Sequence, residues 1–172
     1  MAVRGAAAVV MLLIGGLIGS VAARAAGAAP APESDATGKF PRFESLRANK
    51  VDLRTGPGVR YPIVWVYQRR DLPLEVLRAV EHWRKVRDWE GSVGWVHEKM
   101  LWPHREAIVT GGIRALRASP QPNAAIVARA EPGVIGKLDH CQGGWCRIEA
   151  GDYAGWVTRG EIFGVEPTET VP

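Results

Sequence analysis

The sequence WRKVR at positions 83–87, followed by GWV at 94–96, decides the fold, because this pairing returns later in the chain. Trp83 is matched by Trp145, 62 positions later, and Trp95 is matched by Trp156, 61 positions later. Upstream, the Leu-Arg pair at 53–54 returns at 116–117, an offset of 63. Three landmarks in one order at nearly one offset indicate a duplicated unit of about sixty residues.

The composition favours short strands and frequent turns over a helical bundle. The chain has 172 residues, among them 7 Trp, 20 Gly and 12 Pro. Each repeat is close to the size at which a domain is only marginally stable by itself. We therefore expect an additional stabilising feature: a large aromatic core, an interface between the repeats, or a disulfide.

The net charge is modest and unevenly distributed. The whole chain carries +4, and positions 1–25 account for two of those charges. This balance is too weak to indicate nucleic acid as a partner. Positions 46–106 hold 12 Lys and Arg against 8 Asp and Glu, whereas positions 107–172 hold 6 against 7. The first repeat is therefore the better candidate for an anionic ligand, although a basic solvated surface would have the same composition.

The N-terminus has the pattern of an export signal. Arg4 supplies a positive charge, positions 6–18 are apolar, and two small-x-small cleavage patterns follow. The run is shorter than the roughly 20 residues that a membrane anchor needs, so we expect a signal peptide at 1–25 and no stable membrane insertion after cleavage. A Pro- and Ala-rich linker is expected at 26–45, with Phe40 and Phe43 beginning to dock on the first repeat.

Both repeats show short apolar segments separated by turn residues. The first domain is expected at 46–104, with strands near 51–53, 61–66, 74–78, 83–88 and 93–97. The second is expected at 108–165, with strands near 113–117, 126–127, 134–135, 138–141, 145–149 and 153–157, followed by a tail at 166–172. No segment has a sustained 3.6-residue period. The pattern predicts an all-β protein of two tandem small barrels or sandwiches.

These landmarks resemble the bacterial SH3-like (SH3b) domain family. The family's opening pattern, Leu-x-x-Arg-x-Gly-Pro, appears contracted as VDLRTGP at 51–57. Its later Gly-Trp patterns match WRKV at 83–86 and GSVGWVH at 91–97, and in the second repeat GWCRI at 144–148 and GDYAGWV at 151–157. The sequence departs from the family pattern at two places. His82 stands where a glycine usually precedes the tryptophan. In the second repeat, Ala118-Ser119-Pro120 stands where the Arg-x-Gly-Pro loop beside the ligand groove is expected. The second departure puts ligand binding by the second repeat in doubt.

The resemblance implies a non-enzymatic binding module with an SH3-like barrel in each repeat. Proteins of this kind often bind cell-wall peptide or position a partner enzyme at peptidoglycan. Together with the export signal, this points to a periplasmic or secreted protein whose partner is peptidoglycan peptide or an envelope protein. We expect no cofactor and no metal site.

Cys141 and Cys146 are the only cysteines, and we expect them to form a disulfide. Four residues separate them, two of which are glycines, so a hairpin would place the cysteines opposite each other. An exported protein is in a compartment that permits disulfides. The alternatives are a redox pair, a catalytic Cys beside His140, or a metal site that includes these three residues. None of these matches the usual spacing or surroundings.

Aromatic and basic side chains of the first repeat are the candidate ligand-binding residues. Trp95 and Trp156 are expected in the cores. Tyr61 and Trp83 are predicted groove walls, since aromatic grooves recognise extended or Pro-rich peptides. Three arginines could meet ligand carboxylates: Arg54, Arg84 and Arg87. The histidines at 82, 97 and 104 are expected to have surface or capping roles.

Two other functions stay open from the sequence. The aromatics could form an interface between the repeats or with a larger envelope assembly, which would make this a structural protein. A Cys-dependent cell-wall peptidase is the remote alternative, because the two repeats take up the chain after the linker and leave no segment for a catalytic domain.

Overall fold

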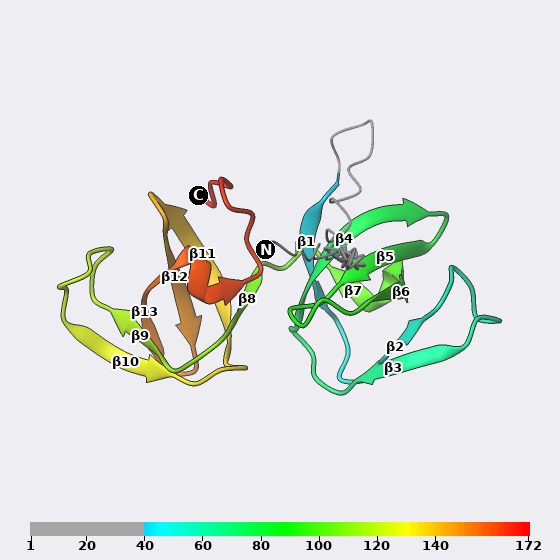
Figure 1. Cartoon of the computed structure of the whole chain (residues 1–172), viewed down its shortest axis with the longest axis horizontal. Helices are drawn as coiled ribbons and strands as arrows, with labels where there is room; N and C mark the ends of the chain where they lie inside the picture. The colour runs from blue at the N-terminus through cyan, green and yellow to red at the C-terminus, as the bar shows by residue number, and fades with distance from the viewer. Residues whose placement is uncertain (1–39) are drawn as a thin grey trace, which may run out of the picture. The chain divides into compact units, whose positions relative to one another are not determined.

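The computed structural model describes residues 40–172. The expected signal peptide and most of the expected linker lie outside these residues. No helix in the described part of the chain is long and apolar enough to cross a membrane. The prediction of an all-β fold is confirmed: the described chain forms two seven-stranded sheets and two short 3₁₀ turns (Figure 1).

Repeat one, as we call strands β1 to β7, is an antiparallel sheet in the order β3-β2-β6-β5-β4-β1-β7. A 3₁₀ turn, η1 (Glu98–Met100), precedes the last strand. The strands are β1 (Arg42–Leu46), β2 (Val51–Arg54), β3 (Ile63–Tyr67), β4 (Pro73–Val80), β5 (Trp83–Arg87), β6 (Val93–His97) and β7 (Leu101–Trp102).

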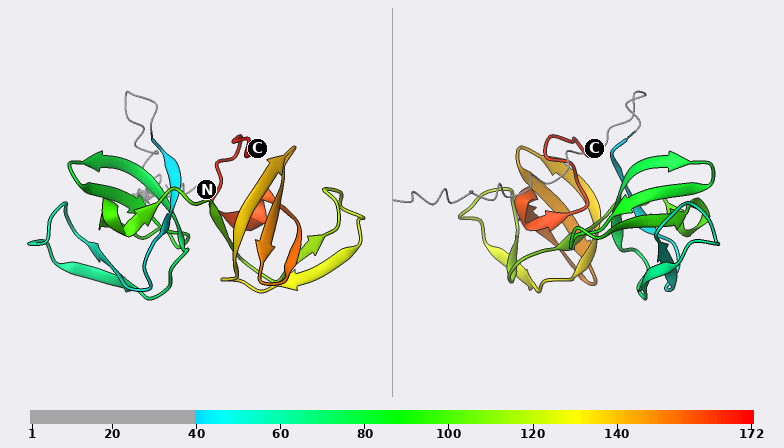
Figure 2. Two further views of the ribbon diagram at one scale, coloured as in Figure 1. Left: turned by 180° about the vertical axis from the view of Figure 1, so that it is seen from behind. Right: turned by 45° about the vertical axis from the view of Figure 1, so that its right-hand side comes forward.

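Repeat two, strands β8 to β14, has the same topology, in the order β10-β9-β13-β12-β11-β8-β14. Its ribbon runs from yellow-green to red in Figure 2. Its 3₁₀ turn is η2 (Arg159–Glu161). The strands are β8 (Glu106–Val109), β9 (Arg114–Arg117), β10 (Ile126–Ala130), β11 (Ile135–Gln142), β12 (Trp145–Ala150), β13 (Tyr153–Thr158) and β14 (Ile162–Phe163). The duplication therefore holds element by element.

The landmark motifs occupy equivalent positions in the two sheets. Trp83 lies opposite His97 across β5 and β6, and Trp145 lies opposite Thr158 across β12 and β13. Likewise Arg54 pairs with Trp95, and Arg117 pairs with Trp156. These registers define which residues of the two repeats correspond.

Each sheet encloses its own core of alternating side chains. Successive residues of a strand point to opposite faces of the sheet, so every second side chain faces the interior. In repeat one, the inward-facing residues Leu53, Leu74, Val86 and Val96 are fully buried. In repeat two the corresponding core includes the residues Leu116, Leu138, Ile148 and Val157. Trp95 is buried as expected, whereas Trp156 is half-buried.

Residues beyond the expected domain limits also belong to the folded part. β1 begins at Arg42, and Phe40 and Phe43 are both buried, so residues 42–45 form sheet where a linker was expected. Their rings bury more apolar surface than a Pro- and Ala-rich segment could, which anchors this strand. At the other end Val171 is buried, and its carbonyl accepts a 3.0 Å hydrogen bond from the Cys141 amide.

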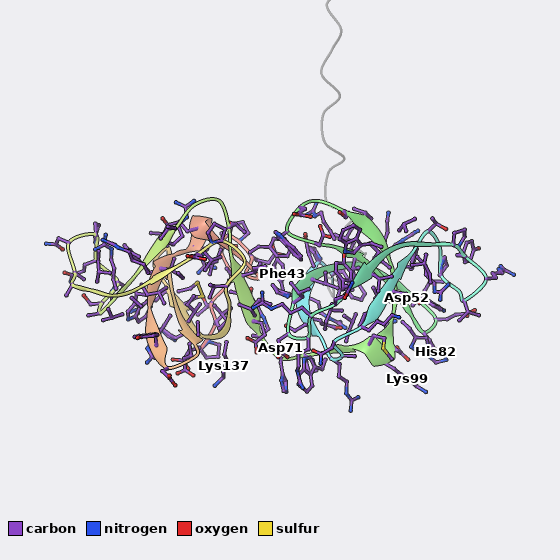
Figure 3. All side chains as sticks on the ribbon, turned by 90° about the horizontal axis from the view of Figure 1, so that it is seen from below. Phe43, Asp52, Asp71, His82, Lys99 and Lys137 are labelled. Atoms are coloured by element: carbon purple, nitrogen blue, oxygen red, sulfur yellow. A yellow bond between two sulfur atoms is a disulfide. The ribbon has the colours of Figure 1, made fainter. Side chains whose placement is uncertain are left out.

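The two repeats contact each other through apolar residues. The ring of Phe43, which is labelled in Figure 3, meets the Phe163 ring edge-on at a centroid distance of 5.0 Å. Ile108, from β8, is buried in the core cluster of repeat one. One polar contact joins them as well, a 2.8 Å hydrogen bond from the Arg69 guanidinium to the Gly133 carbonyl.

Candidate functional site

Repeat one carries a groove of about 380 Å³, which we call the β2–β6 groove. Its wall is built from the beginning of β2, the loop after it, the β5–β6 pair and η1. The lining residues are Lys50, Val51, Asp52, Arg54, Val59, Trp83, His97 and Met100. The lining combines an apolar floor with charged side chains, which is the usual character of a ligand site.

Trp83, which was predicted as a groove wall, lines one side of this groove. The Trp83 side chain is half-buried, and the His97 ring meets it edge-on at 5.3 Å with an interplanar angle of 74°. The cross-strand pairing of Trp83 and His97 places both rings on one face of the sheet. An indole held in this way offers a rigid apolar surface to a ligand.

Arg54 lines the groove, but its guanidinium is engaged by the protein itself. It donates to Asp52 Oδ2 at 3.0 Å, to the Val59 carbonyl at 3.0 Å and to the Tyr61 carbonyl at 2.9 Å. These bonds tie β2 to the loop that follows it. The predicted contact between Arg54 and a ligand carboxylate would therefore compete with three existing bonds.

Tyr61 lies outside the residues that line the groove. Its ring packs so closely on Gly56 that a Cβ at this position would overlap the ring, and Gly58 lies against the other side of the ring. The Arg60 guanidinium sits 5.3 Å from the ring centroid. Tyr61 therefore shapes the loop that borders the groove.

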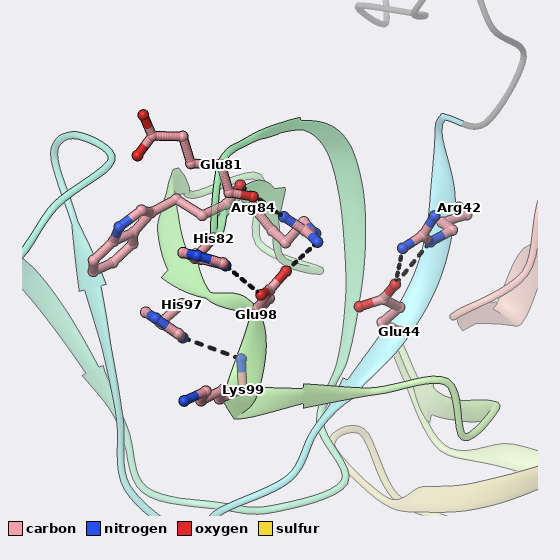
Figure 4. Close-up of polar contacts among 9 residues, drawn as sticks. Arg42, Glu44, Glu81, His82, Arg84, His97, Glu98 and Lys99 are labelled. Carbon is pink, nitrogen blue, oxygen red and sulfur yellow. Dashed lines mark hydrogen bonds and ion pairs between the residues drawn. The ribbon is translucent and has the colours of Figure 1, made fainter.

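Arg84 and Arg87 also have partners within the protein. Arg84 forms a 2.5 Å ion pair with Glu98 and donates to the Glu81 carbonyl at 3.0 Å (Figure 4). Arg87 pairs at 2.6 Å with Glu75, which is buried. Neither arginine lines the β2–β6 groove, so the structure brings only Trp83 and Arg54 of the five predicted ligand residues together there.

A cluster of histidines and Glu98 stands beside Trp83. The His82 ring donates from Nδ1 to Glu98 Oε1 at 2.7 Å, and the His82 and His97 rings stack at 6.1 Å (Figure 4). The hydrogen bond from His82, with the nearby Arg84 charge, lowers the pKa of Glu98. Glu98 thus remains an anion that is already neutralised by its neighbours.

Sequence reasoning missed Lys50, His97 and Met100 as groove residues. A surface or capping role was expected for His97, and it caps η1: its Nδ1 accepts a hydrogen bond from the Lys99 amide at 3.2 Å. Only the register of β5 with β6 shows that the same ring also faces the groove. The signal available in the sequence was the position of His97 directly after the Gly-Trp-Val motif.

The equivalent surface of repeat two is built differently. By register, Arg114 takes the place of Val51, and Glu161 takes the place of Met100. Arg114 and Glu161 form an ion pair at 3.3 Å, and Glu161 also accepts from the Thr158 amide at 3.2 Å. An ion pair therefore replaces the apolar floor of the β2–β6 groove.

The predicted disulfide between Cys141 and Cys146 is confirmed, with an S–S distance of 2.08 Å. The two residues face each other across β11 and β12, and both are fully buried. The bond consumes both thiols, so neither cysteine is available as a nucleophile or as a thiolate metal ligand. Within residues 40–172 no group of three potential ligand side chains is placed to hold a metal ion.

The two sheets, their shared topology and the Gly-Trp motifs can be compared with known proteins. The bacterial SH3 domain family matches residues 47–103 and 111–164. The chain belongs to the bacterial SH3 domain family. It carries two tandem copies, and bacterial SH3 domains are generally binding modules without catalytic activity of their own.

No curated protein matches the chain. Among solved structures, "Structure of NlpC2 from Trichomonas vaginalis" shares 14% identity, covering 73% of this chain and 48% of that one, with a TM-score of 0.34. "Structure of NlpC1 from Trichomonas vaginalis" shares 14% identity, covering 76% and 48%, also with a TM-score of 0.34. The chain thus spans about half the length of these two proteins.

Proposed function

We propose that this protein is an exported tandem bacterial SH3 module that binds peptidoglycan peptide through the β2–β6 groove of repeat one. The groove itself is the observation that carries the proposal. It presents the Trp83 indole and an apolar floor, and such surfaces hold extended peptides by stacking and by excluding water. Family membership supports binding rather than catalysis.

The charge distribution supports repeat one as the binding repeat. Lys50 and Arg54 line its groove, whereas an ion pair between Arg114 and Glu161 occupies the equivalent place in repeat two. Opening that pair to a ligand would break a contact that already satisfies both charges. A ligand therefore meets less competition in repeat one.

We place the protein in the periplasm or outside the cell. The apolar segment at 6–18 and the small residues after it support export. The Cys141–Cys146 disulfide supports the same compartment, since disulfides persist where thiols are not kept reduced. The intact mass of the exported protein tests this proposal, and a mass that still includes residues 1–25 would contradict it.

Sedimentation with purified peptidoglycan tests the function. The wild-type protein should pellet with peptidoglycan, and Trp83→Ala should weaken retention by at least about tenfold because it removes a central aromatic contact. Trp145→Ala, the equivalent change in repeat two, is the matched control and should leave retention unchanged. Equal retention of all three proteins would overturn the assignment to the β2–β6 groove.

An envelope protein is the second candidate partner. The observation in its favour is β3, an edge strand on which Ile63, Val64 and Trp65 are 47%, 53% and 57% exposed. An exposed apolar edge strand is typical of a surface that pairs with another chain. If peptidoglycan fails to retain the protein and Trp65→Lys abolishes capture of an envelope protein, this second function replaces the first.

A further inference from the structure

The β2–β6 groove contains two hydrogen-bond donors that the sequence prediction did not include. They are the Lys50 ammonium, just before β2, and the His97 imidazole, at the end of β6. Both line the same cavity, together with Trp83, Val51 and Met100. Their chemistry indicates which kind of ligand the groove accepts.

The tautomer of His97 follows from its hydrogen bond to the backbone. Nδ1 accepts from the Lys99 amide at 3.2 Å, so in the neutral ring the hydrogen lies on Nε2. The bond also fixes the orientation of the ring, and the edge-on contact with Trp83 at 5.3 Å restrains it further. His97 therefore serves as an oriented donor in the groove wall.

Lys50 supplies a positive charge without a partner in the described part of the chain. It is exposed and makes no hydrogen bond or ion pair with any residue between 40 and 172. The acid that lines the groove, Asp52, is already paired with Arg54 at 3.0 Å, and Glu98 of η1 is paired with Arg84 at 2.5 Å. The groove is left with a net positive charge.

We propose that Lys50 and His97 together bind a carboxylate group of the ligand, with an aliphatic side chain next to that carboxylate resting on the floor of the groove. A carboxylate accepts from both an ammonium and an imidazole N–H, and bonds of this charge-assisted type are the stronger ones. Val51 and Met100 supply the apolar contact. This inference rests on the proposed function and adds the chemical class that the groove selects.

Repeat two lacks both donors, which supports the assignment. The position equivalent to Lys50 is Ile113, and the position equivalent to His97 is Thr158. The acid Glu161 stands where repeat one has Met100 and would repel a carboxylate. Carboxylate binding therefore belongs to repeat one alone.

The experiment compares native peptidoglycan with peptidoglycan whose carboxylates have been converted to amides. The wild-type protein should bind the amidated material about tenfold more weakly than the native material. His97→Asn should abolish this difference while the fold is kept, because the shorter amide still caps η1 but no longer reaches into the groove as a donor. Lys50→Gln should also abolish it.

Lys99→Gln is the matched control. It removes the same charge next to His97, but the Lys99 side chain does not line the groove, and its backbone amide still donates to His97. This variant should keep the full tenfold discrimination. If it loses the discrimination as Lys50→Gln does, the effect is general attraction to an anionic wall, and the proposal is overturned.

The remaining outcomes separate this inference from the proposed function. Equal binding of the wild-type protein to native and amidated peptidoglycan would leave the function intact and overturn carboxylate recognition. Failure to bind native peptidoglycan would overturn both. Competition with acetyl-alanyl-alanine and with acetyl-glutamate amide then identifies the carboxylate. Displacement by acetyl-alanyl-alanine indicates a C-terminal carboxylate, and displacement by acetyl-glutamate amide indicates a side-chain carboxylate. If neither compound displaces the protein, the proposal is contradicted.

Discussion

The two repeats share one topology but stabilise it by different means. Repeat two joins Cys141 to Cys146 across β11 and β12, and by register the same two positions in repeat one are Ala79 and Arg84. Repeat one instead contains a buried hydrogen bond of 2.9 Å from the Tyr67 hydroxyl to Asp88.

That polar pair has no counterpart in repeat two. The positions equivalent to Tyr67 and Asp88 are Ala130 and Ala150. Asp88 also accepts from the amides of Glu90 and Ser92, at 3.0 and 2.8 Å, so it organises the turn between β5 and β6. A repeat of about sixty residues is marginal by itself, and each copy has acquired its own additional link.

The groove surfaces of the two repeats have also diverged, as their stabilising contacts have. Duplication preserved the buried alternation that defines the barrel, because a change there would cost packing energy. Positions that line the groove diverged nevertheless: Val51, which is buried, corresponds to Arg114, and Met100 corresponds to Glu161. The comparison shows that the shared core residues specify the fold, whereas the binding properties of each groove depend on the residues that line it in that repeat.

Removal of the disulfide gives the largest expected effect. Cys141→Ser with Cys146→Ser should lower the free energy of unfolding of repeat two by about 2 kcal/mol, on the chain-entropy model for a short loop. Denaturant titration followed by tryptophan fluorescence measures this. Dithiothreitol should shift the wild-type midpoint in the same direction and leave the double variant unchanged. A midpoint insensitive to both changes would show that the hairpin holds without its covalent link.

Tyr67→Phe tests the link of repeat one. Burial and the Asp88 carboxylate raise the pKa of the Tyr67 phenol, so it remains a donor throughout the accessible pH range. Loss of that hydrogen bond to a buried carboxylate should lower the free energy of unfolding by about 1.5 kcal/mol. The exposed Tyr153→Phe change in repeat two is the control. A stability equal to wild type for Tyr67→Phe would mean that the two backbone amides satisfy Asp88 without the phenol.

Glu106, at the start of β8, should give the protein an unusual pH dependence. Burial, with a smaller contribution from the Asp71 charge, raises the pKa of Glu106 to about 7. The folded state then binds a proton that the unfolded chain releases above its ordinary pKa near 4.5. By linkage, this group's contribution to stability is full below about pH 4.5 and is lost as the pH rises through about 7.

Glu106→Gln should therefore stabilise the protein at pH 8, by about 1 kcal/mol after allowance for partial solvent exposure, and should flatten the fall in stability between pH 5 and 8. Thermal unfolding across that pH range is the measurement. The exposed Glu131→Gln change in the same repeat is the control. A parallel pH profile for Glu106→Gln and wild type would refute the role of Glu106.

The smallest expected effect concerns the ion pair that fills the groove position of repeat two. Glu161→Gln removes the charge that meets Arg114 but keeps an oxygen that can accept from the Thr158 amide. The loss should be about 0.5 kcal/mol and should vanish in 1 M salt, because a partly exposed pair is screened. A loss that persists in 1 M salt would contradict a screened ion pair as the source of the effect.

The sequence by itself determined the duplication, the all-β fold and the disulfide. These depend on local periodicity, turn residues and spacing, and such signals survive in a linear pattern: Trp95 lies in a Gly-Trp-Val strand, and a hairpin joins Cys141 to Cys146. Tyr61 and Trp83 were both predicted as groove walls, and of the two only Trp83 is among the lining residues of the β2–β6 groove.

Only the tertiary structure decided which polar side chains are available to a ligand. Arg84 and Arg87 were predicted to meet a ligand, but Glu98 and Glu75, which the fold brings close to them, already pair with these arginines. Arg54 is engaged by Asp52 of its own strand and by the loop that follows. Lys50 and His97 lie 47 positions apart and meet in one groove only because β2 pairs with β6. The reason is physical: charge satisfaction and the lining of a cavity depend on distances between strands that no local pattern encodes.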